Sequence, residues 1–168
     1  MSWWERRMEG LAKTRVGGWL AVNIGNPIDR RLLSLTGGRV GVFLGAPVGL
    51  LETVGAKSGE PRRTPLLYLD EGDRVVLVAS KAGSARHPAW YHNLRAHPRV
   101  RFLRRGGRRA EYVAREATGP ERERLWAKVN DLYAGYETYQ GRAGSRRIPV
   151  VVLEPAGQAG ASDSPVRP

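Results

Sequence analysis

The sequence predicts an α+β fold in which about six mostly antiparallel strands form a barrel-like sheet with flanking helices. Three observations carry this prediction. Short apolar or alternating runs recur from residue 39 to residue 153, turn-forming residues separate them, and only two or three segments among them have helical character. Because the strands do not alternate regularly with long helices, a doubly wound parallel sheet is not expected.

The strands are assigned from apolar runs bounded by turn residues. The clearest is RVVLVA at 74–79, which follows an Asp/Gly turn at 70–73 and an apolar run at 64–69, so these two runs are expected to form a hairpin. Arg105-Gly106-Gly107 joins two alternating runs in the same way. The expected strands are 39–44, 48–54, 64–69, 74–79, 99–104, 108–115 and 148–153.

Two of the predicted helices lie at 3–20 and 88–96. In residues 3–20, Trp4, Met8 and Leu11 fall near one helical face, and most of the cations lie elsewhere. A short helix is expected at 88–96, beginning at a proline.

A third helix is predicted from 118 to about 132. Thr118 and Glu121 have the spacing of a capping box at its start. The tyrosine-rich segment 133–140 either continues this helix or breaks it at Gly135.

The chain is divided into three regions. Residues 1–37 are expected to be an N-terminal helical segment, and residues 38–155 are expected to form the barrel. Residues 156–168 are rich in Ala, Gly, Ser and Pro and are expected to be a disordered tail.

The composition of the 168 residues excludes several classes of protein. There is no cysteine, so disulfides, thiolate catalysis and zinc–thiolate sites are excluded and a cytoplasmic setting is expected. No apolar run approaches the roughly 20 residues needed to span a bilayer. His87, His92 and His97 are five residues apart, which does not suit a pair of ligands on one helix, and no metal site is expected.

The net charge of +12 is an indication of the partners. Residues 56–115 contain 14 Lys or Arg and 5 Asp or Glu, so the positive charge lies within the predicted barrel. Nucleic acid, an anionic membrane surface and a multiply anionic small ligand all fit this charge. The basic segment RFLRRGGRR at 101–109 is accompanied by no nucleic-acid-binding motif, so specific binding of nucleic acid is not expected.

A polar turn at 55–62 has two interpretations. It lacks the glycine spacing of a nucleotide-binding phosphate loop. It is either an ordinary hairpin turn or an anion-binding turn, in which glycines leave backbone N–H groups free and Lys57, Ser58 and Arg62 add donors.

Two further groups of polar side chains are candidates for a site. Ser80 and Lys81 follow the end of the 74–79 strand. Their side chains either belong to a solvated loop or donate hydrogen bonds to a ligand. Tyr133, Tyr136 and Tyr139 recur every three residues, and they either pack on the sheet or form one wall of a pocket for a flat ligand.

Several blocks in order resemble the deazaflavin-dependent nitroreductase family of actinobacterial oxidoreductases. The resemblance extends from about Leu51 to Pro155, and the N-terminal region is only loosely similar. The blocks are GAKSGEPRRTPLLYL at 55–69, VASKAGSARHPAWYHNLRAHPRV at 78–100, ATGPERERLWAKV at 117–129, YAGYETYQ at 133–140 and RRIPVVVLEP at 146–155.

This resemblance implies a split β-barrel like that of FMN-binding flavin reductases, and coenzyme F420, an 8-hydroxy-5-deazaflavin with a phosphate and an oligoglutamate tail, as cofactor. It implies that Tyr133, Tyr136, Tyr139 and Ser80 are the catalytic residues, the tyrosines lining the substrate side. Cofactor-binding residues by the same resemblance are Lys57, Ser58, Arg62, Thr64, Ser80, Lys81, Ala89, Trp90 and Asn93. Ala56 stands where the family often has arginine, which removes one cation from the anion-binding turn.

The implied activity is hydride transfer from reduced deazaflavin to a quinone or another activated alkene, with promiscuous reduction of nitro compounds. Two alternatives stay open, a carrier that binds a deazaflavin or flavin without turnover and a nonspecific nucleic-acid binder.

We expect a monomer with possible peripheral association at the inner face of the cell membrane. Residues 1–20 carry interfacial tryptophans and four cations, which suit an anionic membrane, although the same face could simply pack on the barrel.

Overall fold

The computed structural model describes residues 47–107 and 109–157, and these residues contain a closed barrel of six strands. Neighbours in the order β1-β2-β3-β6-β5-β4 pair antiparallel, and β4 returns to β1 to close the sheet. The predicted α+β split barrel is therefore confirmed. The strands are β1 (Val48–Val54), β2 (Pro61–Glu71), β3 (Arg74–Val78), β4 (Arg99–Leu103), β5 (Arg109–Glu116) and β6 (Val150–Pro155).

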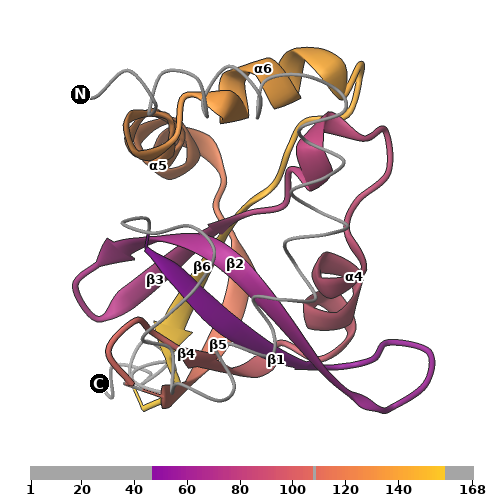
Figure 1. Ribbon diagram of the computed structural model, residues 1–168, viewed down its shortest axis with the longest axis vertical. Helices are drawn as coiled ribbons and strands as arrows, with labels where there is room; N and C mark the ends of the chain where they lie inside the picture. The colour runs from indigo at the N-terminus through magenta and orange to yellow at the C-terminus, as the bar shows by residue number, and fades with distance from the viewer. Residues whose placement is uncertain (1–46, 108, 158–168) are drawn as a thin grey trace, which may run out of the picture.

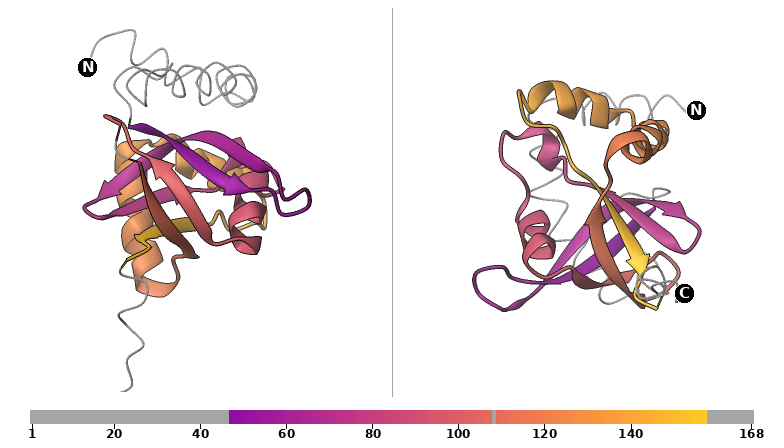
Figure 2. Two further views of the ribbon diagram at one scale, coloured as in Figure 1. Left: turned by 90° about the horizontal axis from the view of Figure 1, so that it is seen from below. Right: turned by 180° about the vertical axis from the view of Figure 1, so that it is seen from behind.

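The helices cover the barrel on one side and at one end. The helix α4 (Ala89–Ala96) lies beside β1 (Figure 1). The helices α5 (Gly119–Leu132) and α6 (Gly135–Arg142) lie together at a distance from α4. A short 3-10 turn, η2 (Lys81–Gly83), contacts α6. The view from behind in Figure 2 shows the same arrangement, with α4 on the side of the barrel where η2 lies.

The core has two parts that share the strands β3 and β6. Val75 and Leu77 belong to the cluster inside the barrel, and Val76 belongs to a second cluster with Leu125 and Val129 of α5. Successive side chains of a strand point to opposite faces, and buried residues of β3 occupy both of them. This double burial explains why RVVLVA is apolar throughout and not at every second position.

The hairpin of β2 and β3 is longer than expected. The strand β2 begins at Pro61 because Arg62 and Arg63 pair with Thr53 and Glu52 of β1. It continues to Glu71, which leaves a turn of two residues at which Gly72 has a φ of 70°. The hairpin itself is confirmed.

The predicted capping box at the start of α5 is wrong. Thr118 is the N-cap residue, but its side chain makes no capping hydrogen bond. The carboxylate of Glu121 instead accepts hydrogen bonds of 2.6 and 2.8 Å from Arg115. A bidentate, charge-assisted pair is stronger than a carboxylate–amide hydrogen bond, so Glu121 turns to the arginine.

Several predicted features lie outside the described residues, namely the helix at 3–20, the strand at 39–44 and most of the tail at 156–168. None of the helices in the part of the chain that is described has the length and apolar character needed to cross a membrane.

Candidate functional site

The turn after β1 gathers the predicted anion-binding residues. Lys57 and Ser58 are exposed in the turn, and Arg62 follows at the start of β2, where its Nη2 donates to Ser58 Oγ at 3.4 Å. The N–H groups of Gly55 and Gly59 are used inside the turn, donating to Glu60 O and Gly55 O. The N–H groups of these two glycines therefore shape the turn, and the side chains of Lys57, Ser58 and Arg62 are candidate donors to an anion.

Asn93 connects this turn to α4. Its Oδ1 accepts from the backbone N–H of Ala56 at 3.0 Å, and its Nδ2 donates to Thr53 Oγ1 at 3.1 Å. The side chain of Asn93 is buried. An amide that satisfies partners on both sides fixes the turn relative to the helix. The predicted contact of Asn93 with a cofactor stays a prediction.

The segment after β3 has an unusual backbone. Lys81 and Ala82 have φ values of 47° and 52°, and Gly83 follows at 79°. Left-handed conformations cost non-glycine residues about 1–3 kcal/mol each, and they persist only where the surrounding structure imposes them. Ser80, which precedes them, is half-buried, and Lys81 is exposed. The observed strain marks this turn as a candidate ligand contact.

Arg146 holds the segment in place. Its guanidinium donates to Ala79 O at 3.1 Å, Ser80 O at 2.8 Å and Ser84 O at 2.9 Å. It also lies 3.2 Å from Nδ1 of His87. No local pattern indicated this role, because Arg146 is more than 60 positions from the carbonyls it binds and is one of two adjacent arginines.

The three tyrosines form a cluster and not a stripe on one helix. Tyr133 lies between α5 and α6, and its hydroxyl is 3.1 Å from that of Tyr139. The rings of Tyr133 and Tyr136 meet edge to face with centroids 5.3 Å apart. The helix breaks before Gly135, where a Cβ atom would lie 2.3 Å from the ring of Tyr133. Of the two predicted alternatives, the break is therefore confirmed.

Tyr136 differs from the other two tyrosines. Its side chain is buried, and its hydroxyl makes no hydrogen bond with the described residues. Burial raises the pKa of the Tyr136 phenol well above its ordinary value. The phenol therefore keeps its proton.

The cluster and the strained turn lie side by side. A Cβ atom at Gly83 would be 2.8 Å from Tyr139 O and 2.7 Å from Cβ of Arg142, so only glycine allows η2 to approach α6 this closely. Figure 1 shows η2 beside the end of α6. The structure thus brings Ser80 and Lys81 together with the tyrosine block.

The remaining predicted residues are more dispersed. Thr64 is half-buried on β2, opposite Leu51, and Ala89 is exposed at the start of α4. Trp90 is buried in the core cluster inside the barrel. Contacts of these three residues with a cofactor stay predictions.

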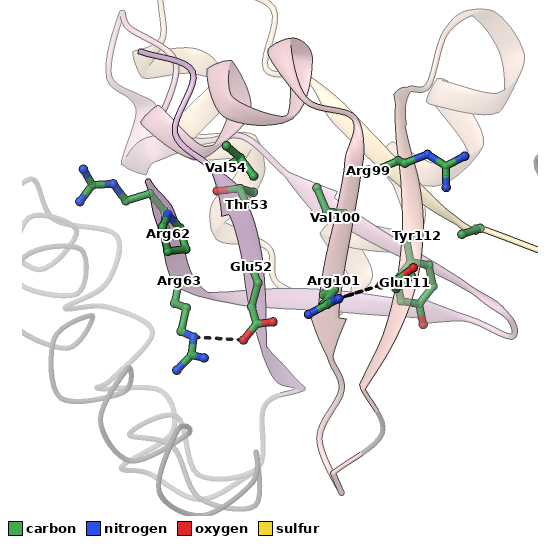
Figure 3. Close-up of a pocket in the computed structure, with 12 residues that line it drawn as sticks. Glu52, Thr53, Val54, Arg62, Arg63, Arg99, Val100, Arg101, Glu111 and Tyr112 are labelled. Carbon is green, nitrogen blue, oxygen red and sulfur yellow. Dashed lines mark hydrogen bonds and ion pairs between the residues drawn. The ribbon is translucent and has the colours of Figure 1, made fainter. Parts of the chain in front are cut away.

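An open pocket of about 420 Å³ lies across β1, β2, β4 and β5. Ion pairs cross its wall between Arg63 and Glu52 and between Arg101 and Glu111, each at 3.0 Å (Figure 3). Four arginines and two glutamates line it, so it is net positive. Arg62 belongs both to this pocket and to the anion-binding turn.

A family model described as F420H(2)-dependent quinone reductase matches residues 28–155. The chain belongs to this family. An F420H(2)-dependent quinone reductase of Mycobacterium tuberculosis (strain ATCC 25618 / H37Rv) is 42% identical over 146 residues, which are 82% of this chain and 97% of the relative. The predicted class, cofactor and activity, an oxidoreductase that uses coenzyme F420 to reduce quinones, are confirmed by this membership.

Solved structures agree with this membership. The structure of an F420-H2 dependent reductase, FDR-A, is 39% identical with a TM-score of 0.59, and the match covers 64% of this chain and 94% of that one. Another, described as a domain-swapped dimer, is 36% identical with a TM-score of 0.61 and covers 74% and 92%. Our expectation of a monomer stays a prediction for this chain.

The predicted cofactor-binding residues fit an anionic, aromatic cofactor. Lys57 makes no ion pair with the described residues, and the guanidinium of Arg62 hydrogen-bonds among them only to the uncharged hydroxyl of Ser58, so both cations are available to a phosphate or carboxylate. The tyrosine cluster adds aromatic surface on another side. The chemistry of the donor set therefore suits the cofactor of the F420H(2)-dependent family.

Proposed function

We propose that this chain binds reduced F420 with its anionic part at Lys57, Ser58 and Arg62 and its ring near the strained turn and the tyrosine cluster. The observation that carries this proposal is the packing of the left-handed turn Lys81–Gly83 against α6, which joins two predicted site blocks that are some 50 residues apart. A strained turn held against an aromatic cluster is typical of a functional site.

When it is bound, reduced F420 supplies the hydride for reduction of the acceptor. A quinone takes up one hydride and one proton to become a hydroquinone. The Tyr136 hydroxyl is our candidate for the proton or hydrogen-bond donor, since it stays protonated and has no partner among the described residues. Ser80 is the second candidate donor. The protein supplies orientation and electrostatics, and the cofactor supplies the redox chemistry.

The acceptor range follows from the same chemistry. Quinones and other activated alkenes accept a hydride at an electrophilic centre, and so do nitroaromatic compounds. We propose quinone reduction as the main activity and nitro reduction as a side activity. The experiment is steady-state oxidation of reduced F420 with menadione and with a nitroimidazole, and the first rate should be the higher.

Replacing Lys57 with alanine should raise the KM for F420 by roughly tenfold or more, because one charge-assisted hydrogen bond contributes about 1.5–3 kcal/mol. The change in kcat should be smaller, since a remote anion is held similarly in the ground and transition states. Lys128→Ala is the matched control: it removes the same charge from α5, where Lys128 pairs with Glu71. Equal KM values for the two variants would remove Lys57 from the site.

We also propose peripheral binding to anionic membranes through residues 1–20, which lie outside the described residues. Interfacial tryptophans and about 1 kcal/mol of attraction per cation near an anionic surface support this. The full-length protein should pellet with anionic vesicles at low salt and remain in the supernatant at high salt. Alanine at Trp3 and Trp4 should weaken the pelleting. If the variant pellets as the wild type does, another surface binds the vesicles.

A further inference from the structure

Arg146 and His87 form a hydrogen-bonded clamp on the segment that carries Ser80 and Lys81. Three of the contacts of the Arg146 guanidinium are backbone carbonyls, those of Ala79, Ser80 and Ser84, which flank the left-handed turn on both sides. The fourth is Nδ1 of the His87 ring at 3.2 Å. Bonds to carbonyls on both sides of the turn fix its ends relative to each other.

The fourth contact requires a neutral histidine. A guanidinium has only donors and keeps its charge, so Nδ1 of His87 must be the acceptor and the ring proton must lie on Nε2. Protonation of Nδ1 would place two donors and two positive charges against each other. Burial and the charge of Arg146 both lower the pKa of His87 below its ordinary value.

The surroundings of His87 offer little to stabilise its charged form. Among the described residues, the carboxylate that faces it is Glu116, which already accepts a hydrogen bond of 2.5 Å from the hydroxyl of Tyr91. The ring of Tyr91 packs on the His87 ring, with centroids 4.7 Å apart. In the described part of the chain, the titratable and charged groups that face His87 are Arg146 from the segment after α6, Tyr91, His92 and Arg95 of α4, and Glu116 of β5.

We propose that Arg146 is a positioning residue for cofactor binding, and that neutral His87 is the switch that completes its clamp on the Ser80–Gly83 turn. The inference rests on the proposed function, in which this turn contacts F420. The strained conformations of Lys81 and Ala82 need an external restraint, and the clamp supplies it. Protonation of His87 removes one contact and lets the turn relax away from its binding geometry.

The pH dependence follows from the lowered pKa of His87. A group with a depressed pKa contributes its interaction while it is neutral and loses it as the pH falls through the folded-state pKa. The affinity for F420 should therefore be constant above the ordinary histidine value of about 6.5 and should fall at more acidic pH.

Three variants separate this role from simple structural support. Arg146→Met removes the donors and keeps an unbranched apolar stem, and it should raise the KM for F420 roughly tenfold or more with a smaller change in kcat. Arg146→Lys should recover only part of the affinity, since an ammonium group cannot span this set of acceptors. His87→Asn retains an acceptor and cannot titrate, so its affinity for F420 should be the same at acid and at neutral pH, and the fall in affinity at acid pH (the acid limb) should be absent. Arg147→Met is the control, because Arg147 is exposed and pairs with Glu123.

The measurements are F420 titration by fluorescence from acid to neutral pH, steady-state KM and kcat, and thermal unfolding of each full-length variant. The result that supports the inference is weakened binding by Arg146→Met with loss of the acid limb in His87→Asn. An acid limb that persists in His87→Asn overturns the switch, and wild-type affinity in Arg146→Met overturns the clamp. If Arg146→Met does not fold, Arg146→Lys with wild-type affinity overturns the clamp equally. Wild-type protein that does not bind F420 would instead overturn the proposed function.

Discussion

Replacing Tyr136 with phenylalanine should lower kcat for quinone reduction about 100-fold, within the range that a general acid contributes. The Tyr136 hydroxyl is the one hydroxyl of the cluster that bonds to none of the described residues, and burial keeps it protonated by raising its pKa. Because no hydrogen bond of the described protein is lost, the free energy of unfolding should change by less than about 1 kcal/mol. The measurements are steady-state kinetics and thermal unfolding.

Tyr133→Phe is the matched control for this substitution. It removes a hydroxyl from the same cluster, and its bond with Tyr139 OH ties that hydroxyl to the protein. We expect a smaller loss of kcat and a larger loss of stability. A normal kcat for Tyr136→Phe would show that the proton comes from elsewhere, Ser80 and solvent being the remaining sources.

Replacing Gly83 with alanine should destabilise the protein by roughly 2–5 kcal/mol. The residue has a φ of 79°, which costs an L-residue about 1–2 kcal/mol, and the new methyl group would overlap the backbone of Tyr139 at a further cost of about 1–3 kcal/mol. Backbone atoms cannot turn aside as a flexible side chain can. The turn and α6 must therefore separate, so the KM for F420 should rise as well.

Gly141→Ala tests whether the effect comes from this contact. Gly141 is in α6, and a Cβ atom there would meet nothing within 4 Å. Alanine in a helix interior is favoured by about 0.5–1 kcal/mol, so this variant should be slightly stabilised. A Gly83→Ala protein with the wild-type melting temperature and KM would contradict the close contact between η2 and α6.

The elements that could be predicted from the sequence are those with a local signal. The strand β3 and the strand β6 read as apolar runs because both of their faces are buried, one inside the barrel and one beneath α5 and α6. The turn at Gly106 and the hairpin turn at Gly72 were indicated by glycines that have positive φ values in the structure. The motif blocks then predicted the family, since several matched in order.

The contacts that hold the site together had no local signal. Asn93 and Ala56 are 37 positions apart, and Arg146 and Ser80 are 66 positions apart. Such contacts depend on the tertiary arrangement of the strands and helices, and the spacing of apolar residues along the sequence does not predict that arrangement. The division of the tyrosine block into Tyr133 before α6 and Tyr136 within it also depends on packing around Gly135. The sequence therefore allowed candidate site residues to be predicted, but not the residues with which they form hydrogen bonds.

The most direct test of F420-dependent quinone reduction is a single-turnover experiment with the full-length protein, reduced F420 and menadione in the absence of oxygen. We predict that the visible absorbance of oxidised F420 returns in step with formation of one hydroquinone per cofactor. The rate should fall about 100-fold in Tyr136→Phe, whose F420 affinity should be unchanged. The contrary result would be wild-type protein that binds reduced F420 tightly but oxidises it no faster than the uncatalysed reaction with menadione. That result would contradict the enzymatic function and would identify a carrier.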